Sequence, residues 1–455
     1  MKHLLFSMCL FFFLHANSQQ LPQFKTLRYD EDYSVLKSDT TASFYRNIKY
    51  LSLSAQGNTY LSIGGEVRYQ YFNIRNEDWG DAPKDDDGFL FSRFLLHTDL
   101  HAGKNFRLFG QLQGSMANGK ASGTSAVDEN PLDLHQAFFD INTNSKNAIL
   151  RVGRQELSYG SQRLISVREL PNNRQSFDAV RSIFSLGSLR LDAFYGRYVT
   201  AKKEIFDDVS NRDINIWGAY LVKNKVPILK NVDLYYLGLS KTKAAFEDST
   251  GKERRHSVGA RVWGADAGWK YDLEGVYQFG KFVGKAISAW TLSANTSYKF
   301  TRASLQPEIG IKTEVISGDR QRGDGRLQTF NPLFPRGAYF GLAALIGPSN
   351  LFDIHPSIAF ELIDDKLTWT VDHDVFWRYS TQDGIYAPNV SIIHTSGNSK
   401  NKFIGHQLAT DVTFTPNQYF LLRVEATWFK AGAYLKDVSP GKDILFGGAT
   451  LQVKF

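Results

Sequence analysis

The stretch LTWTVDHDVFWRY, residues 367–379, alternates large apolar side chains with polar and charged ones. Period two is typical of a β-strand, whose successive side chains point to opposite faces of a sheet. One face here carries Trp369 and Trp377, and the other carries Asp372 and Asp374. Ionised carboxylates need water or a paired charge. The stretch therefore predicts a strand with one apolar face and one hydrated face.

The same alternation recurs from Asn58 to the last residue, Phe455. Polar breaks rich in Gly, Asp or Asn separate the alternating stretches, which indicates turns between strands. A terminal Phe after an alternating strand resembles the signal by which bacterial outer-membrane barrels are recognised for assembly. Candidate strands begin near Asn58, Gly88, Phe106, Leu132, Ala148, Phe177, Ser188, Asp213, Asn231, Arg254, Asp266, Lys285, Leu305, Asn350, Lys366, Lys402, Tyr419 and Asp443.

The connections between these stretches alternate between long and short. A soluble β-sandwich has no reason to sort its loops in this way, whereas a membrane barrel has long outer loops and short periplasmic turns. We therefore predict an all-β fold, a transmembrane antiparallel β-barrel of about 18 strands (16–18). Two connections, 223–230 and 281–284, fit neither class. The long ones are 75–87, 118–131, 155–176, 200–212, 241–253, 317–349, 381–401 and 431–442; the short ones include 101–105, 143–147, Gly187, Gly264-Ala265, 301–304, Asp364-Asp365 and Pro416-Asn417.

Composition excludes several other classes of protein. The chain has 455 residues, with 53 Lys and Arg against 46 Asp and Glu, and a single Cys. The positive charge is spread along the chain, so no basic arm for nucleic acid is indicated. No stretch approaches the roughly 20 apolar residues of a membrane helix. One Cys cannot form a disulfide scaffold.

The N-terminus predicts export. Residues 1–18 combine Lys2 with a short apolar run and small residues at Ala16 and Ser18, which is typical of a cleaved signal peptide. The alternative is a buried N-terminal strand or helix. We expect residues 19–57 to form a periplasmic lead-in and residues 58–455 a single barrel in the outer membrane of a Gram-negative bacterium.

Barrel size bears on function, because 16–18 strands leave an aqueous channel whereas eight do not. A polar inner face then favours a conduit over a lumen that is plugged and merely hydrated. One candidate loop that is longer than ordinary hairpin connections, near residues 152–181, carries Arg154, Arg163, Arg168, Arg174 and Arg181. Folded inward, these would set a positive constriction suited to carboxylates, because guanidinium stays charged and offers a planar donor fork. The alternative is an exposed loop that touches lipopolysaccharide phosphates.

A second unusual stretch runs from Ile316 to Asn350. Its Gly/Asp-rich part lacks the acidic spacing of a calcium loop, so no metal is predicted. The apolar run FNPLFP, residues 330–335, would be unfavourable on an exposed loop and is expected to pack inside the barrel mouth. There it would position the nearby arginines.

Three motifs together resemble the alginate export family of outer-membrane porins: LRYDEDYS at 27–34, GRQEL at 153–157, and SGD at 317–319 with TFNPLFP at 329–335. The resemblance covers essentially the mature chain. It implies an 18-stranded barrel whose arginine-rich pore passes an anionic uronic-acid polysaccharide. In such exporters a long periplasmic turn before the penultimate strand occludes the pore. The matching turn here is only Pro416-Asn417, which departs from that pattern.

The resulting candidates for a substrate-binding constriction come from both unusual stretches. By motif, the resemblance maps Arg154 and Arg163 to the GRQEL segment, and it maps Asp319 and Arg336 to the segment from SGD to Pro335-Arg336. The LRYDEDYS stretch is either a lead-in held by its aromatics or a solvated tail. The candidate residues are Arg154, Arg163, Arg174, Arg181, Asp319, Arg320 and Arg336.

We predict a diffusion channel for anionic poly- or oligosaccharide and no enzyme. The alternatives are a general porin without saccharide specificity, a surface adhesion protein with a closed lumen, and a membrane hydrolase. No GxSxG elbow supports a hydrolase, and no cofactor is indicated. The other expected partners are outer-membrane lipid, lipopolysaccharide and the barrel assembly machinery; periplasmic partners stay open. Seven histidines lack metal-ligand spacing: His97, His101, His135, His355, His373, His394 and His406.

Overall fold

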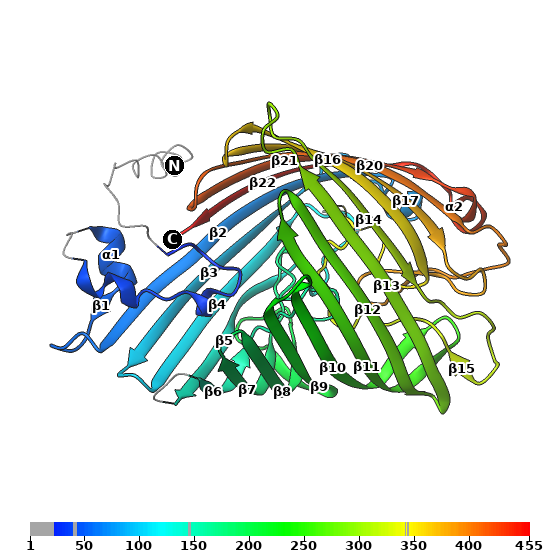
Figure 1. Cartoon of the computed structure of the whole chain (residues 1–455). Coiled ribbons are helices and arrows are strands. Elements are labelled where there is room, and N and C mark those ends of the chain that lie inside the picture. The colour runs from blue at the N-terminus through cyan, green and yellow to red at the C-terminus, as the bar shows by residue number, and fades with distance from the viewer. Residues whose placement is uncertain (1–21, 40–42, 144–146, 342, 344) are drawn as a thin grey trace.

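The computed structural model describes residues 22–39, 43–143, 147–341, 343 and 345–455; the predicted signal peptide lies outside them. Within these residues, long strands wrap in sequence order into a barrel (Figure 1). The barrel strands are β2 (Thr59–Arg75), β3 (Phe89–Ala102), β4 (Phe106–Asn118), β5 (Asn130–Asn142), β6 (Ala148–Gln155), β7 (Phe177–Leu186), β8 (Leu189–Thr200), β9 (Val209–Val226), β10 (Lys230–Phe246), β11 (Ser249–Asp266), β12 (Trp269–Phe282), β13 (Lys285–Lys299), β14 (Glu308–Ile316), β16 (Leu351–Ile363), β17 (Leu367–Arg378), β20 (Phe403–Asn417), β21 (Phe420–Ala431) and β22 (Ile444–Lys454).

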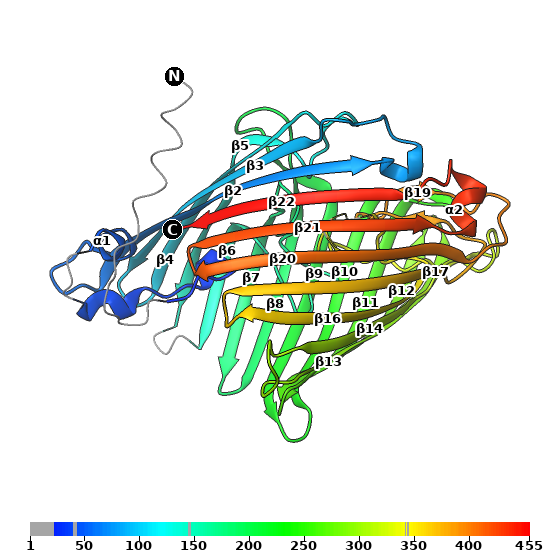
Figure 2. The same ribbon diagram turned by 90° about the horizontal axis from the view of Figure 1, so that it is seen from above.

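The first and last barrel strands close the sheet. β2 pairs antiparallel with β22 over a register that runs from Glu66 opposite Lys454 to Arg75 opposite Leu445. Figure 2 shows the red β22 beside the blue β2. Closure leaves no unpaired strand edge, as a sheet in hydrocarbon requires. The predicted 18-stranded antiparallel barrel is confirmed.

The two faces of the strands differ as the alternation predicts. On β12, the side chains of Trp269, Leu273 and Tyr277 are exposed on the outside of the barrel. Glu274 and Gln278 of the same strand are buried on the inside. An apolar outer face suits hydrocarbon, and a polar inner face lines the lumen.

Two strands extend beyond their predicted ends. The predicted long loop at 241–253 is wrong, because β10 and β11 are joined by Glu247-Asp248 alone. The connection near 281–284 is likewise only Val283-Gly284. Strand segments that stand in water beyond the membrane can be polar on both faces. Polarity in this region therefore marks the edge of the membrane-facing band rather than the end of a strand.

The turn between β20 and β21 is short, as the sequence predicts. β20 ends at Asn417 and β21 begins at Phe420, so only two residues connect them. Among the residues described, no helix is long and apolar enough to cross a membrane. The remaining elements are small: η1 (Arg28–Asp30), η2 (Ser34–Ser38), α1 (Phe44–Lys49), β1 (Leu51–Ser52), η3 (Glu77–Gly80), β15 (Arg326–Leu327), β18 (Ile385–Tyr386), β19 (Ile392–His394) and α2 (Ala433–Val438).

The described residues before the barrel, 22–39 and 43–50, pack against its short-turn end, and we call them the N-terminal segment. Tyr29 and Leu36 are buried, and Tyr50 stacks on Tyr60 of β2 with ring centroids 4.6 Å apart. Figures 1 and 2 place α1 and the carboxyl terminus at the same end of the barrel. Of the two interpretations of LRYDEDYS, the structure therefore shows the packed one.

Candidate functional site

Two long connections fold into the barrel and pair with each other. The first inner loop, residues 156–176, follows β6, and the second inner loop, residues 317–350, follows β14. The amide of Ser166 donates to the carbonyl of Phe334 at 3.0 Å, and the amide of Phe334 donates to the carbonyl of Leu164 at 2.9 Å. The two inner loops thus form one unit inside the barrel wall.

Aromatic packing anchors this unit to the wall. The ring of Phe334 meets Phe177 of β7 edge-on at 5.1 Å and stacks on Tyr198 of β8 at 5.4 Å. Phe330 and Leu333 are also buried. The apolar FNPLFP run therefore packs inside the barrel, as expected from its sequence.

Arg163 ties the first inner loop to the opposite wall. Its guanidinium pairs with Glu274 of β12 at 3.2 Å and with Glu314 of β14 at 2.8 Å. It also donates to Ser293 Oγ at 2.5 Å and contacts the hydroxyl of Tyr339. Burial alone would lower the pKa of Arg163, but Glu314, Tyr339 and Glu274 hold it well above its ordinary value. Arg163 is therefore a permanent cation that holds the first inner loop to the barrel wall.

Arg174 and Arg181 are buried and paired in the same way. Arg174 lies 2.6 Å from carboxylate oxygens of both Glu156 and Glu169, within its own loop. Arg181 of β7 pairs with Asp192 of β8. Paired, desolvated guanidiniums order the structure but offer little free charge to a passing solute.

Two further candidates are more accessible. Arg154 of β6 is partly exposed and pairs with Asp178 of β7 at 2.9 Å. Arg320 is exposed; it contacts the hydroxyl of Tyr379 and lies over that ring, 5.3 Å from the centroid. Tyr379 begins the connection between β17 and β20, so Arg320 contacts that connection, whereas Arg154 contacts the neighbouring strand of the wall.

Asp319 is buried beside a second buried carboxylate. Its amide donates to Asp383 Oδ2 at 2.8 Å, while its own Oδ2 has no partner among the described residues. Burial raises the pKa of Asp319 to about 7, a rise to which the charge of Asp383 adds and which a backbone hydrogen bond from Gln321 opposes. Asp319 thus holds the second inner loop to the connection 379–402 most firmly when it is protonated.

A pH-dependent stability follows from Asp319. A carboxyl whose folded pKa is raised stabilises the fold below its unfolded pKa, and that stabilisation is lost as the pH rises through about 7. We expect Asp319→Asn to become more stable than the native protein between pH 5 and pH 8, by about 1–2 kcal/mol after allowance for solvent screening. Thermal unfolding across this range measures it. The exposed turn variant Asp364→Asn is the control; equal pH profiles for Asp319→Asn and the native protein would contradict the assignment.

Several cations of the inner loops and wall have no ion-pair partner among the described residues, and Arg168, Lys241 and Arg336 are three of them that lie where the two inner loops meet the wall. The Lys241 ammonium lies 5.9 Å from the ring of Phe334, and the charge of Glu253 acts on it more strongly than the opposing charge of Arg168. The Arg336 guanidinium lies 5.0 Å from the ring of Tyr339. These three charges are not neutralised by a direct ion pair, unlike that of Arg163.

Sequence reasoning named Arg168 only as part of the arginine-rich loop and missed Lys241. Lys241 fell in the predicted loop at 241–253. The signal that could have found it is the alternation of β10, in which Leu237, Leu239 and Lys241 share the inward face with Asp233.

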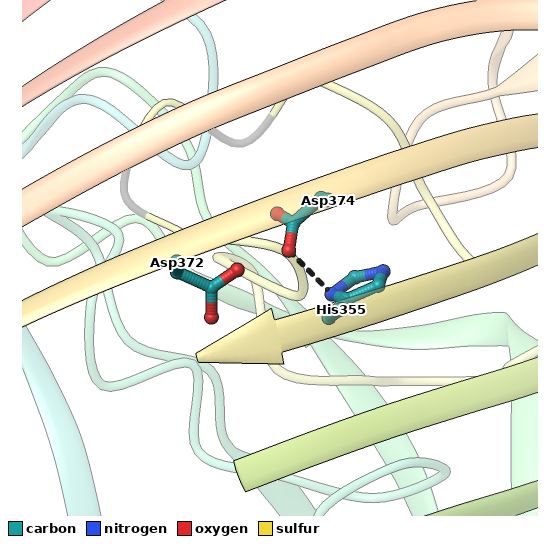
Figure 3. Close-up of side chains that lie close together, drawn as sticks. All are labelled: His355, Asp372 and Asp374. Carbon is teal, nitrogen blue, oxygen red and sulfur yellow. Dashed lines mark ion pairs between the residues drawn. The ribbon is translucent and has the colours of Figure 1, made fainter. Parts of the chain in front are cut away.

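An acidic group with one histidine lies on the inner wall at β16 and β17 (Figure 3). His355 Nδ1 lies 2.7 Å from Asp374, and its Nε2 lies 3.0 Å from Asp353. Asp372 lies beside them, and ligand atoms of His355, Asp372 and Asp374 fall within 4.8 Å of one another. The set has the donors of a divalent cation site. Because both ring nitrogens already face a carboxylate, His355 itself fits the role of the neutralising cation.

The inner loops leave part of the inner wall of the barrel exposed. The side chain of Arg190 on β8 is 45% exposed although it pairs with the inward Asp192. Asn295 of β13, opposite the inward Asp272 of β12, is also exposed. Water therefore reaches part of the inner face.

These features define a class of protein. A closed 18-stranded barrel, apolar outside and hydrated inside, with two loops folded into its lumen, is an outer-membrane channel. The chain belongs to the alginate export family, whose model matches residues 59–442. No match was found among curated proteins.

Solved porins share this fold at low sequence identity. A BenF-like porin from Pseudomonas fluorescens Pf-5 has a TM-score of 0.60 and 10% identity, over 87% of this chain and 98% of that chain. OccK2 (OpdF) from Pseudomonas aeruginosa, in complex with glucuronate, has a TM-score of 0.57 and 11% identity, over 88% and 98%. OpdK from Pseudomonas aeruginosa with vanillate has a TM-score of 0.58 and 10% identity, over 87% and 98%. Family and neighbours are channels and not enzymes.

Proposed function

We propose that the barrel passes anionic saccharides, uronic-acid oligomers or polymers, by diffusion through a lumen lined by cations. The observation that carries this proposal is that Arg168 and Arg336 of the inner loops and Lys241 of the adjacent wall have no ion-pair partner among the described residues. Membership of the alginate export family supports the substrate class. A related fold that binds glucuronate, OccK2, is consistent with it.

The balance of charge suits passage rather than trapping. Conduction requires a solute site that is strong enough to admit the solute and weak enough to release it. Most arginines near the loops are already neutralised, for example Arg163 by Glu274 and Glu314. The unpaired cations then attract a carboxylate moderately, and the guanidinium forks of Arg168 and Arg336 match its geometry.

A general porin is the second candidate function. The observation in its favour is the mixture of inward carboxylates and cations, such as Asp272 with Arg261 at 2.7 Å. Such a lining filters solutes by size with little regard to their charge. Equal permeation of neutral and acidic oligosaccharides of one length would favour it.

Export and assembly complete the proposal. Residues 1–18 direct the chain across the inner membrane and are removed, residues 19–57 remain at the periplasmic side, and residues 58–455 form the barrel. The alternating C-terminal strand, which ends at Phe455, is the segment that the barrel assembly machinery would recognise. Outer-membrane lipid and lipopolysaccharide would surround the apolar outer face.

Ion selectivity in planar bilayers tests the channel. We expect the native protein to prefer anions, and the triple variant Arg168→Gln/Lys241→Gln/Arg336→Gln to shift the reversal potential toward cations. The control removes the same charge from exposed, outward or turn positions: Lys252→Gln/Lys281→Gln/Arg302→Gln. A native channel without anion preference, or a triple variant that behaves like its control, would refute the proposal. Arg154→Glu tests one of the two more accessible candidate arginines in the same measurement.

A further inference from the structure

Three aspartates meet where the connection between β8 and β9, residues 201–208, lies against the start of β5, at the long-loop end of the barrel. Asp133 belongs to β5, and Asp207 and Asp208 end the connection. One carboxylate oxygen from each of the three lies within 4.8 Å of the other two. Asp133 precedes Asp208 by 75 residues, so no local spacing in the sequence predicts the group. Only the fold brings these charges together.

Backbone contacts hold the connection beside the strand. Ile205 forms an isolated parallel bridge with Leu132, and the amide of Phe206 donates to the Leu132 carbonyl at 3.0 Å. The amide of Asp208 donates to Asp133 Oδ2 at 2.9 Å. These bonds set the positions of the carboxylates, but they do not separate the like charges. Three negative charges this close repel one another unless a cation lies among them.

One arginine approaches the aspartates, but it is bound more closely to another carboxylate. Arg154 Nη1 lies 3.7 Å from Asp133 Oδ1, whereas its Nε lies 2.9 Å from Asp178 of β7. Its further contact with the group is to the backbone carbonyl of Asp208, at 3.4 Å. Among the described residues, no ion pair involves the side chain of Asp207 or Asp208. Two of the three carboxylates therefore lack a cationic partner in this part of the chain.

A buried amide beside the aspartates indicates a ligand independently of their charge. Asn130 of β5 is 1% exposed, and its Nδ2 donates to Asp208 Oδ2 at 2.9 Å, so the end of its side chain points at the group. Its Oδ1 is buried and has no hydrogen-bond partner among the described residues, an unfavourable state for an amide oxygen. With the amide turned over, Oδ1 would face Asp208, an arrangement that a cation between the two oxygens favours. Asp207 Oδ1 is likewise buried without a hydrogen-bond partner there.

The donors are all oxygens, which selects the kind of cation. Carboxylate and amide oxygens suit the hard cations Ca²⁺ and Mg²⁺, whereas Zn²⁺ favours histidine and cysteine. Mg²⁺ demands a near-ideal octahedron, while Ca²⁺ accepts irregular sets of six to eight oxygens. The ligands here come from a strand and an irregular connection, which favours Ca²⁺. Asp207 and Asp208 are partly exposed, so water can complete the coordination.

We propose that Asn130, Asp133, Asp207 and Asp208 form a Ca²⁺ site that fastens the connection 201–208 to β5 at the long-loop end of the barrel. The ion is bound by a carboxylate oxygen of each aspartate and by the amide oxygen of Asn130. It neutralises the charges that Arg154 leaves unpaired, so the position of the connection depends on the cation. The proposal does not depend on the solute that the channel passes.

Titration calorimetry of the whole barrel, treated with EDTA and held in detergent without lipopolysaccharide, measures binding of the ion. We expect Ca²⁺ to bind with a dissociation constant of roughly 10⁻⁴ to 10⁻³ M, the range of extracellular calcium modules, and Mg²⁺ to bind more weakly. Asp207→Asn/Asp208→Asn keeps the shape of both side chains and removes two ligand charges, so it should weaken Ca²⁺ binding by about tenfold or more. Glu204→Gln/Asp213→Asn, which removes two exposed carboxylates from the same region, is the matched control and should bind Ca²⁺ like the native protein.

Proteolysis of the connection measures whether the ion fastens it. Lys202 and Lys203 are exposed, and cleavage after them by endoproteinase Lys-C requires the connection to open. At a Ca²⁺ concentration about ten times the dissociation constant, cleavage there should slow by about tenfold, because only the closed connection binds the ion. Ca²⁺ should slow it equally in Glu204→Gln/Asp213→Asn and should have no such effect in Asp207→Asn/Asp208→Asn.

A variant that gains affinity keeps the test decisive should the double aspartate variant fail to fold. Asn130→Asp converts the amide into a fourth carboxylate and should tighten Ca²⁺ binding. A native protein that binds no Ca²⁺, or an affinity that Asn130→Asp does not raise, overturns the proposal. Equal binding by the native protein and Asp207→Asn/Asp208→Asn would reveal an adventitious ion only. Binding that leaves the Lys-C cleavage rate unchanged would overturn the fastening of the connection.

Discussion

Arg163→Gln is expected to release the first inner loop from the barrel wall and to destabilise the protein by about 3–5 kcal/mol, the usual result of removing one partner from a buried ion pair. The reason lies in what the change leaves behind. Glu274 and Glu314 are buried on neighbouring parts of the wall, and both face Arg163. Without the guanidinium, Glu314 keeps Lys312 at 3.2 Å as its one ion-pair partner among the described residues.

Three further variants separate the causes. Arg163→Lys keeps the charge but loses the fork that reaches both carboxylates, so a partial loss is expected. Arg163→Gln/Glu314→Gln removes both members of one pair and should recover part of the stability, as a double-mutant cycle would show. Arg190→Gln, which breaks a half-exposed pair with Asp192, should cost at most about 1 kcal/mol.

Urea unfolding of the barrel in lipid vesicles measures these differences, and limited proteolysis detects release of residues 156–176. If Arg163→Gln and Arg190→Gln unfold at the same urea concentration, Arg163 does not hold the first inner loop to the wall. Residues 156–176 that stay resistant to proteolysis in Arg163→Gln would lead to the same conclusion.

The barrel itself was predictable because hydrocarbon and water impose one rule on every residue of a membrane strand. Leu273 must face lipid and Glu274 must not, so apolar and polar residues alternate along each strand. The same rule fails where a strand leaves the membrane. Lys241 and Glu253 lie on strands that pair directly, yet their polarity indicated a loop.

The partners of the inner loops could not be predicted in this way. Arg163 lies 111 residues before Glu274, and no local pattern links the two. The apolar FNPLFP run signalled that its loop turns inward, but not that Phe334 would pair with Leu164 and Ser166 of the other loop. A charged loop side chain has many carboxylates within reach, and only the folded wall selects among them.

Leu273→Arg should be the most damaging single change on the outer face. On β12, Leu273 lies midway between two outward aromatics, Trp269 and Tyr277, and 46% of it is exposed. This spacing places it near the middle of the apolar band, where arginine costs about 2–4 kcal/mol. A loss of this size is expected in urea unfolding in vesicles, together with poor assembly into the barrel.

The adjacent strand offers a control at the same level. Leu273 pairs with Ala294 of β13, and the next residue, Asn295, points inward opposite Asp272. Asn295→Arg adds the same charge to the hydrated face beside a carboxylate, so its expected cost is small. Because the two positions share their height in the membrane and differ only in the face they occupy, similar losses for both variants would contradict the assignment of lipid and water to the two faces. A large loss for Leu273→Arg alone would establish that assignment energetically.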